Sequence, residues 1–267
     1  IKKLVSYCLF FYYPEIFKKL DFENELDVAQ EFLIQVTERT AKLAAQVMMA
    51  GFVHGVLNTD NINISGELFD YGPYRFLPEY DPSFTAAYFD HNGLYCYGRQ
   101  PASFLWALQQ LAISLNVAYP QLKFDNLDEI FSQYFNENLQ SAFLKRLNLK
   151  PSTEDRNLQL ISLFFQLMQR SKISFEQAFF DFHSKRSLNN IAKVDFYFPL
   201  AADFLKYLGE FEVADPSLAS SDYFSQEKPT TLLIDEIEKI WSFIEKEDNW
   251  SPYEEKLRQI RSFRGMY

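Results

Sequence analysis

Apolar side chains recur at steps of three and four residues along most of the chain, which is the spacing of an amphipathic α-helix. The longest such run covers residues 21–50, where Asp21 or a polar neighbour could cap the start and Gly51 ends the helix. The same spacing returns in shorter runs at residues 102–115, 127–147, 158–168, 175–182, 204–208 and 232–244. The pattern predicts a mainly helical protein.

Residues 51–101 interrupt this helical pattern. They hold most of the glycines and many Asn and Asp residues, which favour turns and ordered loops. Ile62 and Ile64 alternate with polar residues, and a turn at residues 65–67 would fold this short strand into an antiparallel hairpin. The expected fold class is therefore mainly α, with a small β-hairpin insert. Residues 213–231 are predicted to be an exposed connection or a loop inside one domain.

Composition narrows the functional classes. The formal net charge is -10, so an electrostatic grip on nucleic acid or on an anionic membrane is disfavoured. Cys8 and Cys96 are the only cysteines, which makes a structural zinc site unlikely and favours a reducing, cytoplasmic location. The apolar start of the chain is interrupted by Pro14, and we interpret it as core rather than as a signal peptide or membrane span.

The insert also carries the residues best suited to chemistry. Asn61 and Asp70 would meet if the chain between them forms a hairpin, and an amide oxygen with a carboxylate suits magnesium, whose other ligands would be water and phosphate oxygens. Protein kinases hold their metal with such a pair, the Asp lying in a D-x-G turn. The corresponding triplet here is Asp70-Tyr71-Gly72. The residues therefore indicate ATP and Mg²⁺ as candidate ligands.

The match to the kinase pattern is incomplete. His54-Gly55-Val56 stands where kinases have His-Arg-Asp, and Val56 cannot accept a proton. Asp60 is the remaining carboxylate close to the same metal and could take over as base. The arrangement indicates either an unusual phosphotransfer enzyme or an inactive pseudokinase. We expect His54 to support the loop backbone and Trp106 to lie in the core.

Residues 51–61 and 69–73 closely resemble the selenoprotein-O family. Further matches follow in the family's order at residues 81–82, 90–95, 100–101 and 105–108. The resemblance implies a protein-kinase-like fold that binds ATP in a flipped orientation and transfers AMP to Ser, Thr or Tyr hydroxyls of other proteins. By matching positions it implies that Asp60 is the proton acceptor, Asn61 a magnesium ligand, and Asp70 a ligand of both magnesium and nucleotide.

The resemblance has three departures, one of which is that the family's C-terminal continuation, with its terminal Cys or selenocysteine, is missing beyond Tyr267. The family's nucleotide-clamping lobe, with its Lys, Arg and phosphate loop, is not found, so we expect residues 1–267 to be the C-terminal lobe and to be inactive alone. Arg99 stands where the family pattern has Asn. The expected partners are ATP and protein substrates, and the oligomeric state is not predicted. The alternative is a non-catalytic pseudokinase that binds proteins, while ordinary kinase activity is disfavoured by Val56.

Overall fold

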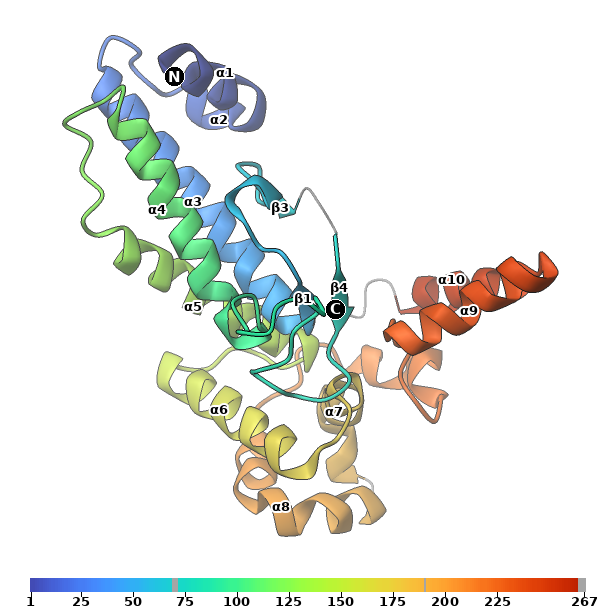
Figure 1. Ribbon diagram of the computed structural model, residues 1–267. Coiled ribbons are helices and arrows are strands. Elements are labelled where there is room, and N and C mark those ends of the chain that lie inside the picture. The colour runs from blue at the N-terminus through green and yellow to red at the C-terminus, as the bar shows by residue number, and fades with distance from the viewer. Residues whose placement is uncertain (69–71, 190, 264–267) are drawn as a thin grey trace. The chain divides into compact units, whose positions relative to one another are not determined.

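The computed structural model describes residues 1–68, 72–189 and 191–263, and it divides into two compact units. The first unit comprises residues 1–74 and 83–139, and the second comprises residues 75–82 and 140–267. Helices dominate both units, and the few strands are two or three residues long (Figure 1). The prediction of a mainly helical protein with a small β insert is confirmed.

The first unit is built on two long helices that lie side by side, α3 and α4 (Figure 1). Its helices are α1 (Lys2–Tyr12), α2 (Pro14–Phe17), α3 (Glu25–Met49), α4 (Gln100–Asn116) and the start of α5 (Leu127–Arg146). The core comes from the inward stripes of α3 and α4, which include Phe32, Leu33, Val36, Phe104, Leu108 and Ala112. These positions follow the three- and four-residue spacing because one helical face packs against its neighbour.

The ends of α3 show how local signals set a helix boundary. Asn24, rather than Asp21, caps the helix, because its side-chain oxygen accepts a hydrogen bond from the Asp27 amide at 3.4 Å. Gly51 follows the helix with φ of 61°, the left-handed conformation that ends many helices. The expected end is confirmed, and the cap is one of the polar neighbours of Asp21.

The insert between α3 and α4 contains short strands and two 3₁₀ turns. These elements are β1 (Phe52–His54), η1 (Thr59–Asn61), β2 (Ile62–Asn63), β3 (Glu67–Leu68), β4 (Tyr74–Phe76) and η2 (Tyr97–Arg99). Strands β2 and β3 are antiparallel, with Ile62 opposite Leu68 and Asn63 opposite Glu67. The predicted hairpin is therefore confirmed, but its turn lies at residues 64–66, one residue earlier than expected, because Glu67 already belongs to β3.

The second unit packs around a cluster of phenylalanines. Its elements are the end of α5, α6 (Glu154–Ser171), α7 (Phe175–Phe182), η3 (His183–Asn189), α8 (Ile191–Gly209), η4 (Pro216–Ser220), η5 (Asp222–Ser225), α9 (Ile234–Glu247) and α10 (Ser251–Ser262). Phe164 makes ring contacts with Phe143, Phe179, Phe182 and Phe204, all fully buried. These contacts account for part of the chain's 28 phenylalanines.

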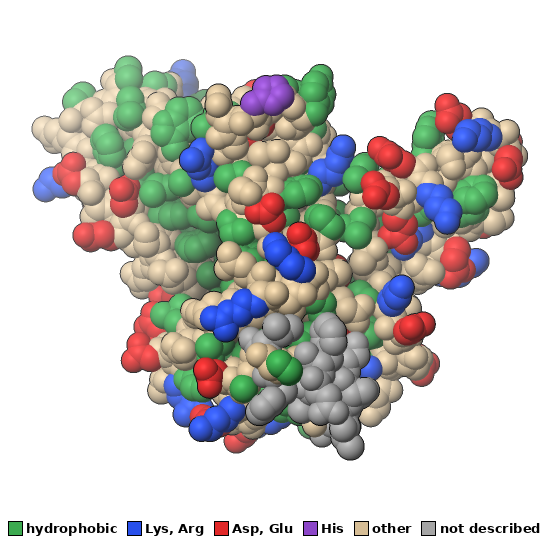
Figure 2. Space-filling view, turned by 60° about the horizontal axis from the view of Figure 1, so that its bottom comes forward, with side chains coloured by type: hydrophobic (Ala, Val, Ile, Leu, Met, Phe, Trp, Pro, Cys, Tyr) green, Lys and Arg blue, Asp and Glu red, His purple; other side chains and the backbone are tan. Residues whose placement is uncertain are grey.

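Residues 213–231 form a loop inside the second unit, the second of the two predicted alternatives. Tyr223 and Phe224 of this loop are buried and pack against Phe180 of α7. Helices α9 and α10, at the upper right of Figure 2, carry interspersed acidic and basic side chains.

One sequence-based interpretation of a single side chain is wrong. Trp106 was expected in the core, but half of its surface (51%) is exposed. His183 is fully buried at the end of α7 and stacks on Phe224. The apolar N-terminus is core on one face only: Val5 and Leu9 are buried, whereas other large side chains of α1 are exposed. Within the described ranges, no helix is long and apolar enough to cross a membrane.

Candidate functional site

The segment with the predicted chemistry starts at β1 and runs through η1 into the β2–β3 hairpin. Its first side chain, His54, is fully buried. The Val56 amide donates to His54 Nδ1 at 3.1 Å, so this ring nitrogen is an acceptor and does not carry a proton. His54 therefore fixes the backbone at the start of the loop, which is the supporting role that the sequence predicts.

Gln100 holds this loop against α4, and the sequence analysis did not single it out. Its side-chain Oε1 accepts from the His54 amide at 2.9 Å, and its Nε2 donates to the Phe52 carbonyl at 2.9 Å. The side chain is fully buried, so losing it would remove two hydrogen bonds that tie β1 to the start of α4. The only sequence signal was the Gln100-Pro101 pair at the start of α4, which belongs to the family-like run.

Gly55 allows the chain that follows the β2–β3 hairpin to pack closely against the loop at Pro73. Its amide donates to the Pro73 carbonyl at 2.7 Å. A Cβ atom at residue 55 would lie 2.5 Å from that oxygen and 2.9 Å from Ala87 Cβ, so a side chain does not fit. Next to this contact, Tyr74 stacks on Phe52 with ring centroids 5.5 Å apart. Asp70, the predicted second metal ligand, lies outside the described residues.

Asn61 is held in an orientation that suits a metal ligand. The side chain is 6% exposed, and its Nδ2 donates to the Val56 carbonyl at 2.6 Å. A carbonyl only accepts, so the amide nitrogen must face it and Oδ1 must face the other way. Oxygen is the atom that Mg²⁺ takes from an amide, so Asn61 fits a magnesium site. No hydrogen bond from the described part of the chain engages Oδ1.

Asp60 is exposed at the centre of η1, directly beside Asn61. The charge of Asp60 acts on the nearby hydroxyl of Tyr95. Burial raises the pKa of this hydroxyl, and the negative charges of Asp90 and Asp60 raise the pKa further. Tyr95 therefore keeps its proton and donates it in a hydrogen bond to Asn58 Oδ1. The loop with the exposed Asp60 carboxylate is thus contacted by an uncharged hydrogen-bond donor, the Tyr95 hydroxyl.

Asp90 positions Tyr95. Its two carboxylate oxygens accept from the Leu94 amide at 2.8 Å and from the Tyr95 amide at 2.9 Å. The Arg99 guanidinium donates to the Gly93 carbonyl at 3.1 Å, which holds the same turn from the other side. These contacts give a structural role to the run at residues 90–95.

A largely apolar groove opens beside this turn, with a volume of about 420 Å³. Its walls include Leu57, Asn58, Leu94, Tyr95, Arg99 and Trp106. The groove explains why Trp106 is exposed, since its ring forms part of an open wall rather than of the helix-packing face.

The structure thus brings Asp60 and Asn61 together on a supported loop. In the part of the chain that is described, no three His, Cys, Asp or Glu side chains gather into a metal cluster. Asp70 lies outside the described residues, so the predicted metal-binding pair of Asn61 and Asp70 stays a prediction.

Comparison with known proteins finds the same family that the sequence resembles. The family model described as "Protein adenylyltransferase SelO" matches residues 1–261. "Protein nucleotidyltransferase YdiU" of Trichormus variabilis is 32% identical over 98% of this chain and 56% of its own length. The protein of the same name from Synechocystis is 33% identical over 98% of the chain and 58% of its own length.

A vertebrate relative matches as well. "Protein adenylyltransferase SelO-1, mitochondrial" of Danio rerio is 35% identical over 71% of this chain and 26% of its own length. The chain therefore spans little more than half the length of the cyanobacterial relatives and about a quarter of the fish protein.

Proposed function

This chain belongs to the SelO family of protein adenylyltransferases, and on that premise we propose that its full gene product transfers AMP from ATP to hydroxyl side chains of proteins. The observation that carries the proposal for this chain is the loop at residues 54–61. It presents an exposed carboxylate, Asp60, beside a buried amide, Asn61, whose nitrogen is already hydrogen-bonded. The match to the YdiU protein of Trichormus variabilis covers 98% of the chain, and the family model covers residues 1–261, so both include this loop.

Asn61 and Asp70 are the residues we propose as ligands of Mg²⁺, with Asp70 also facing the nucleotide. The orientation of the Asn61 amide supports the first assignment, because the oxygen is the atom left for a cation. The contact between Gly55 and Pro73 supports the second, because it returns the chain to the loop three residues after Asp70. A bound magnesium ion supplies positive charge that stabilises the phosphates during transfer.

Asp60 is the proposed proton acceptor. As the acceptor hydroxyl oxygen forms a bond to the α-phosphorus of ATP, its proton passes to the Asp60 carboxylate. The bond between the α-phosphorus and the bridging oxygen breaks, and pyrophosphate leaves with that electron pair. The products are the AMP-modified protein and pyrophosphate. Because Asp60 is exposed, a hydroxyl on another protein can approach it without displacing core side chains.

We further propose that the first unit corresponds to part of the C-terminal lobe of a protein-kinase-like fold. The order of its parts supports this: a long helix, a loop after a short strand, a hairpin, and a second long helix. Since the chain spans about half the length of its cyanobacterial relatives, we also propose that it binds ATP more weakly alone than within its full gene product. Its two buried free cysteines agree with a reducing, cytoplasmic location.

The test is to incubate the full gene product with magnesium and ATP that is labelled at either the α- or the γ-phosphate. The proposal expects protein labelling from α-labelled ATP only, and its loss in Asp70→Ala. Labelling from γ-labelled ATP would instead establish a kinase. If neither label is transferred and calorimetry detects no ATP binding, the chain is better described as a non-catalytic binding module.

A further inference from the structure

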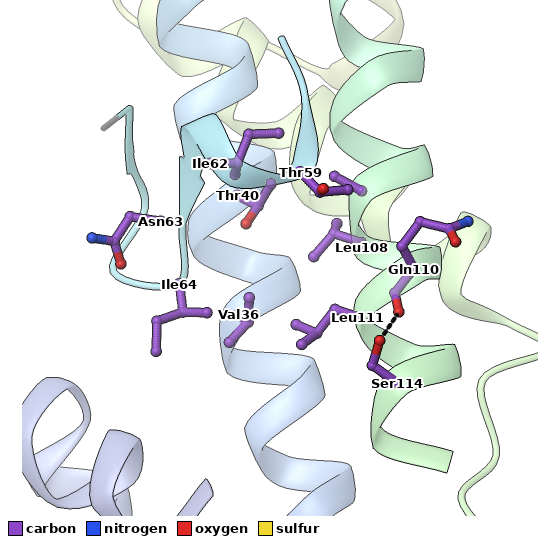
Figure 3. Close-up of a pocket in the computed structure, with 11 residues that line it drawn as sticks. Val36, Thr40, Thr59, Ile62, Asn63, Ile64, Leu108, Gln110, Leu111 and Ser114 are labelled. Carbon is purple, nitrogen blue, oxygen red and sulfur yellow. Dashed lines mark hydrogen bonds between the residues drawn. The ribbon is translucent and has the colours of Figure 1, made fainter. Parts of the chain in front are cut away.

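A cavity and a groove adjoin the loop at residues 54–61. The cavity, of about 250 Å³, lies between α3, α4 and the β2–β3 hairpin (Figure 3). The Thr40 hydroxyl on its wall has no hydrogen-bond partner among the described residues, but it is fully buried, so a ligand cannot reach it. The groove is the one of about 420 Å³ beside Asn58, and it differs because large apolar side chains and a cation are exposed on its wall.

The groove leaves large apolar side chains open to solvent. Leu94 is 56% exposed and Trp106 is 51% exposed, while Leu57 is a buried part of the wall between them and the loop backbone. Apolar side chains that gather along a groove mark a surface that another molecule covers, because covering them removes apolar area from water. This wall therefore suits an apolar side chain of a bound molecule.

Arg99 is the only charged side chain among the described residues that line the groove. Its Nη1 atom donates to the Gly93 carbonyl at 3.1 Å and to the Asn92 carbonyl at 3.4 Å, which fixes the guanidinium plane. No hydrogen bond or ion pair from the described part of the chain engages Nε or Nη2. This open edge of the guanidinium matches a carboxylate, which accepts two parallel hydrogen bonds from it.

Asn58 connects the groove to the proposed chemistry. Its Oδ1 accepts from the Tyr95 hydroxyl, and no hydrogen bond within the described ranges engages its Nδ2, so an amide donor is left for a main-chain carbonyl of a bound peptide. Asp60 follows two residues later, so the two Cα atoms are at most about 7 Å apart. At about 3.3 Å per residue, a peptide beside Asn58 reaches Asp60 within about two to four residues.

We propose that this groove docks the protein substrate, with an apolar side chain against Leu94 and Trp106 and a neighbouring Asp or Glu carboxylate on Arg99. The proposal rests on the proposed function, because docking there brings an acceptor hydroxyl to Asp60. A polypeptide supplies all three matching groups: an apolar side chain, a carboxylate and a main-chain carbonyl. The preferred substrate is thus a segment with an acidic and an apolar residue side by side, close to the acceptor.

The test uses peptides with one Ser acceptor in an Ala-Gly background and a Leu-Glu pair about two to four residues to either side of it. Matched peptides carry Leu-Gln or Leu-Lys instead. Ligand-observed NMR on the 267-residue chain without ATP measures binding, and AMP transfer by the full gene product measures KM and kcat. We expect Leu-Glu peptides to bind roughly 3- to 10-fold more tightly than Leu-Gln peptides, with a smaller difference at high salt.

Two variants separate docking from a disturbed fold. Arg99→Glu should reverse the preference, so that Leu-Lys peptides bind more tightly than Leu-Glu peptides. A disturbed turn at Gly93 would weaken binding but would not create this new preference. Trp106→Ala should weaken Leu-Glu and Leu-Gln peptides alike, roughly 5- to 10-fold. Lys123→Glu and Ile113→Ala are the matched controls, exposed in the first unit but not lining the groove, and should change neither affinity.

In the full gene product the variants should raise KM for Leu-Glu peptides and leave kcat within about twofold, because neither side chain takes part in the transfer step. The docking proposal is overturned if the unmodified chain binds no peptide or shows no preference among the three kinds, or if Arg99→Glu keeps the original order. AMP transfer without the preference would contradict docking alone. The predicted preference without any AMP transfer would support the groove as a peptide site and contradict the proposed function.

Discussion

Two buried asparagines, one in each unit, use their side-chain amides differently. Asn148 in the second unit is 4% exposed and engages both ends of its amide: Nδ2 donates to Ser184 Oγ and to the Asp215 carbonyl, and Oδ1 accepts from the Asp215 amide at 3.0 Å. Asn61 in the first unit is 6% exposed, but only its nitrogen is engaged, by the Val56 carbonyl.

The difference separates a structural side chain from one that is free to bind. Asn148 uses both of its donors and one of the two acceptor positions of its oxygen to hold one loop to another, so it has little left for a ligand. The single bond of Asn61 fixes the amide plane and leaves its oxygen for another partner. Burial alone therefore does not distinguish the two asparagines, whereas the open side-chain oxygen of Asn61 does.

The largest expected effect concerns the exposed carboxylate beside Asn61. Asp60→Asn should lower AMP transfer by the full gene product roughly 10²- to 10⁴-fold, because the proton acceptor is removed while the side-chain shape is kept. Thermal stability should hardly change, since Asp60 is exposed. Label transfer from α-labelled ATP measures the first quantity and a thermal melt measures the second.

Asp125→Asn is the control for this experiment, because Asp125 is an exposed aspartate outside the loop. It should leave both quantities unchanged. If Asp60→Asn retains more than about a third of the transfer rate, Asp60 does not act as the general base.

The next effect compares a glycine from each unit. Gly55→Ala should destabilise the chain by about 1–3 kcal/mol, because the new Cβ would meet the Pro73 carbonyl at 2.5 Å and the backbone would have to shift. Gly209→Ala meets no atom within 4 Å and should stabilise the chain by about 0.4–1 kcal/mol. Urea unfolding measures both changes, and a Gly55→Ala chain as stable as the unmodified one would contradict the close packing at Gly55.

The smallest effect concerns a tyrosine that ties the hairpin turn to the N-terminal helices. The Tyr13 hydroxyl donates to the Ile64 carbonyl, and burial raises the pKa of Tyr13 to about 12, against a lowering by the Arg39 guanidinium. The folded state thus holds this proton more tightly than the unfolded state. The contribution of Tyr13 to stability is complete below the unfolded pKa of 10.0 and is lost as pH rises through about 12.

Unfolding free energies measured from about pH 9 to about pH 12 test this expectation. The unmodified chain should lose about 1.4 kcal/mol per pH unit more than Tyr13→Phe within that window. In the second unit, burial and a hydrogen bond to Asp181 also raise the pKa of Tyr197, so Tyr197→Phe should lose alkaline sensitivity in the same direction. Parallel curves for Tyr13→Phe and the unmodified chain would show that the Tyr13 hydroxyl is not buried.

The helices could be predicted from the sequence because packing against a neighbour imposes a local period. The spacing of apolar residues does not show which side of a helix is exposed to solvent. Phe104 and Leu108 are one turn apart and share the buried face of α4, whereas Trp106 lies two residues from each and so points to the opposite side. The stacking of His183 on Phe224, far along the chain, likewise has no local period that could indicate it.

In the candidate site too, some residues could be predicted from the sequence and others could not. Asp60 and Asn61 could be found because their residue types and their place in a family-like run point to one chemistry. Gln100 could not, because its bond to the His54 amide joins residues 46 positions apart and has no local pattern. The closeness of Gly55 to Pro73 and the unpartnered hydroxyl of Thr40 likewise became visible only in three dimensions.

The most direct test of the central claim is a magnesium titration of AMP transfer in Asn61→Ala and Asn148→Ala forms of the full gene product. If Asn61 holds the metal, Asn61→Ala should raise the magnesium concentration needed for half-maximal transfer about tenfold or more, the loss expected when about 1.4 kcal/mol of ligand binding is removed. Asn148→Ala should be less stable but keep the original magnesium midpoint. An unchanged midpoint in Asn61→Ala, or an equal shift in both variants, would contradict the account.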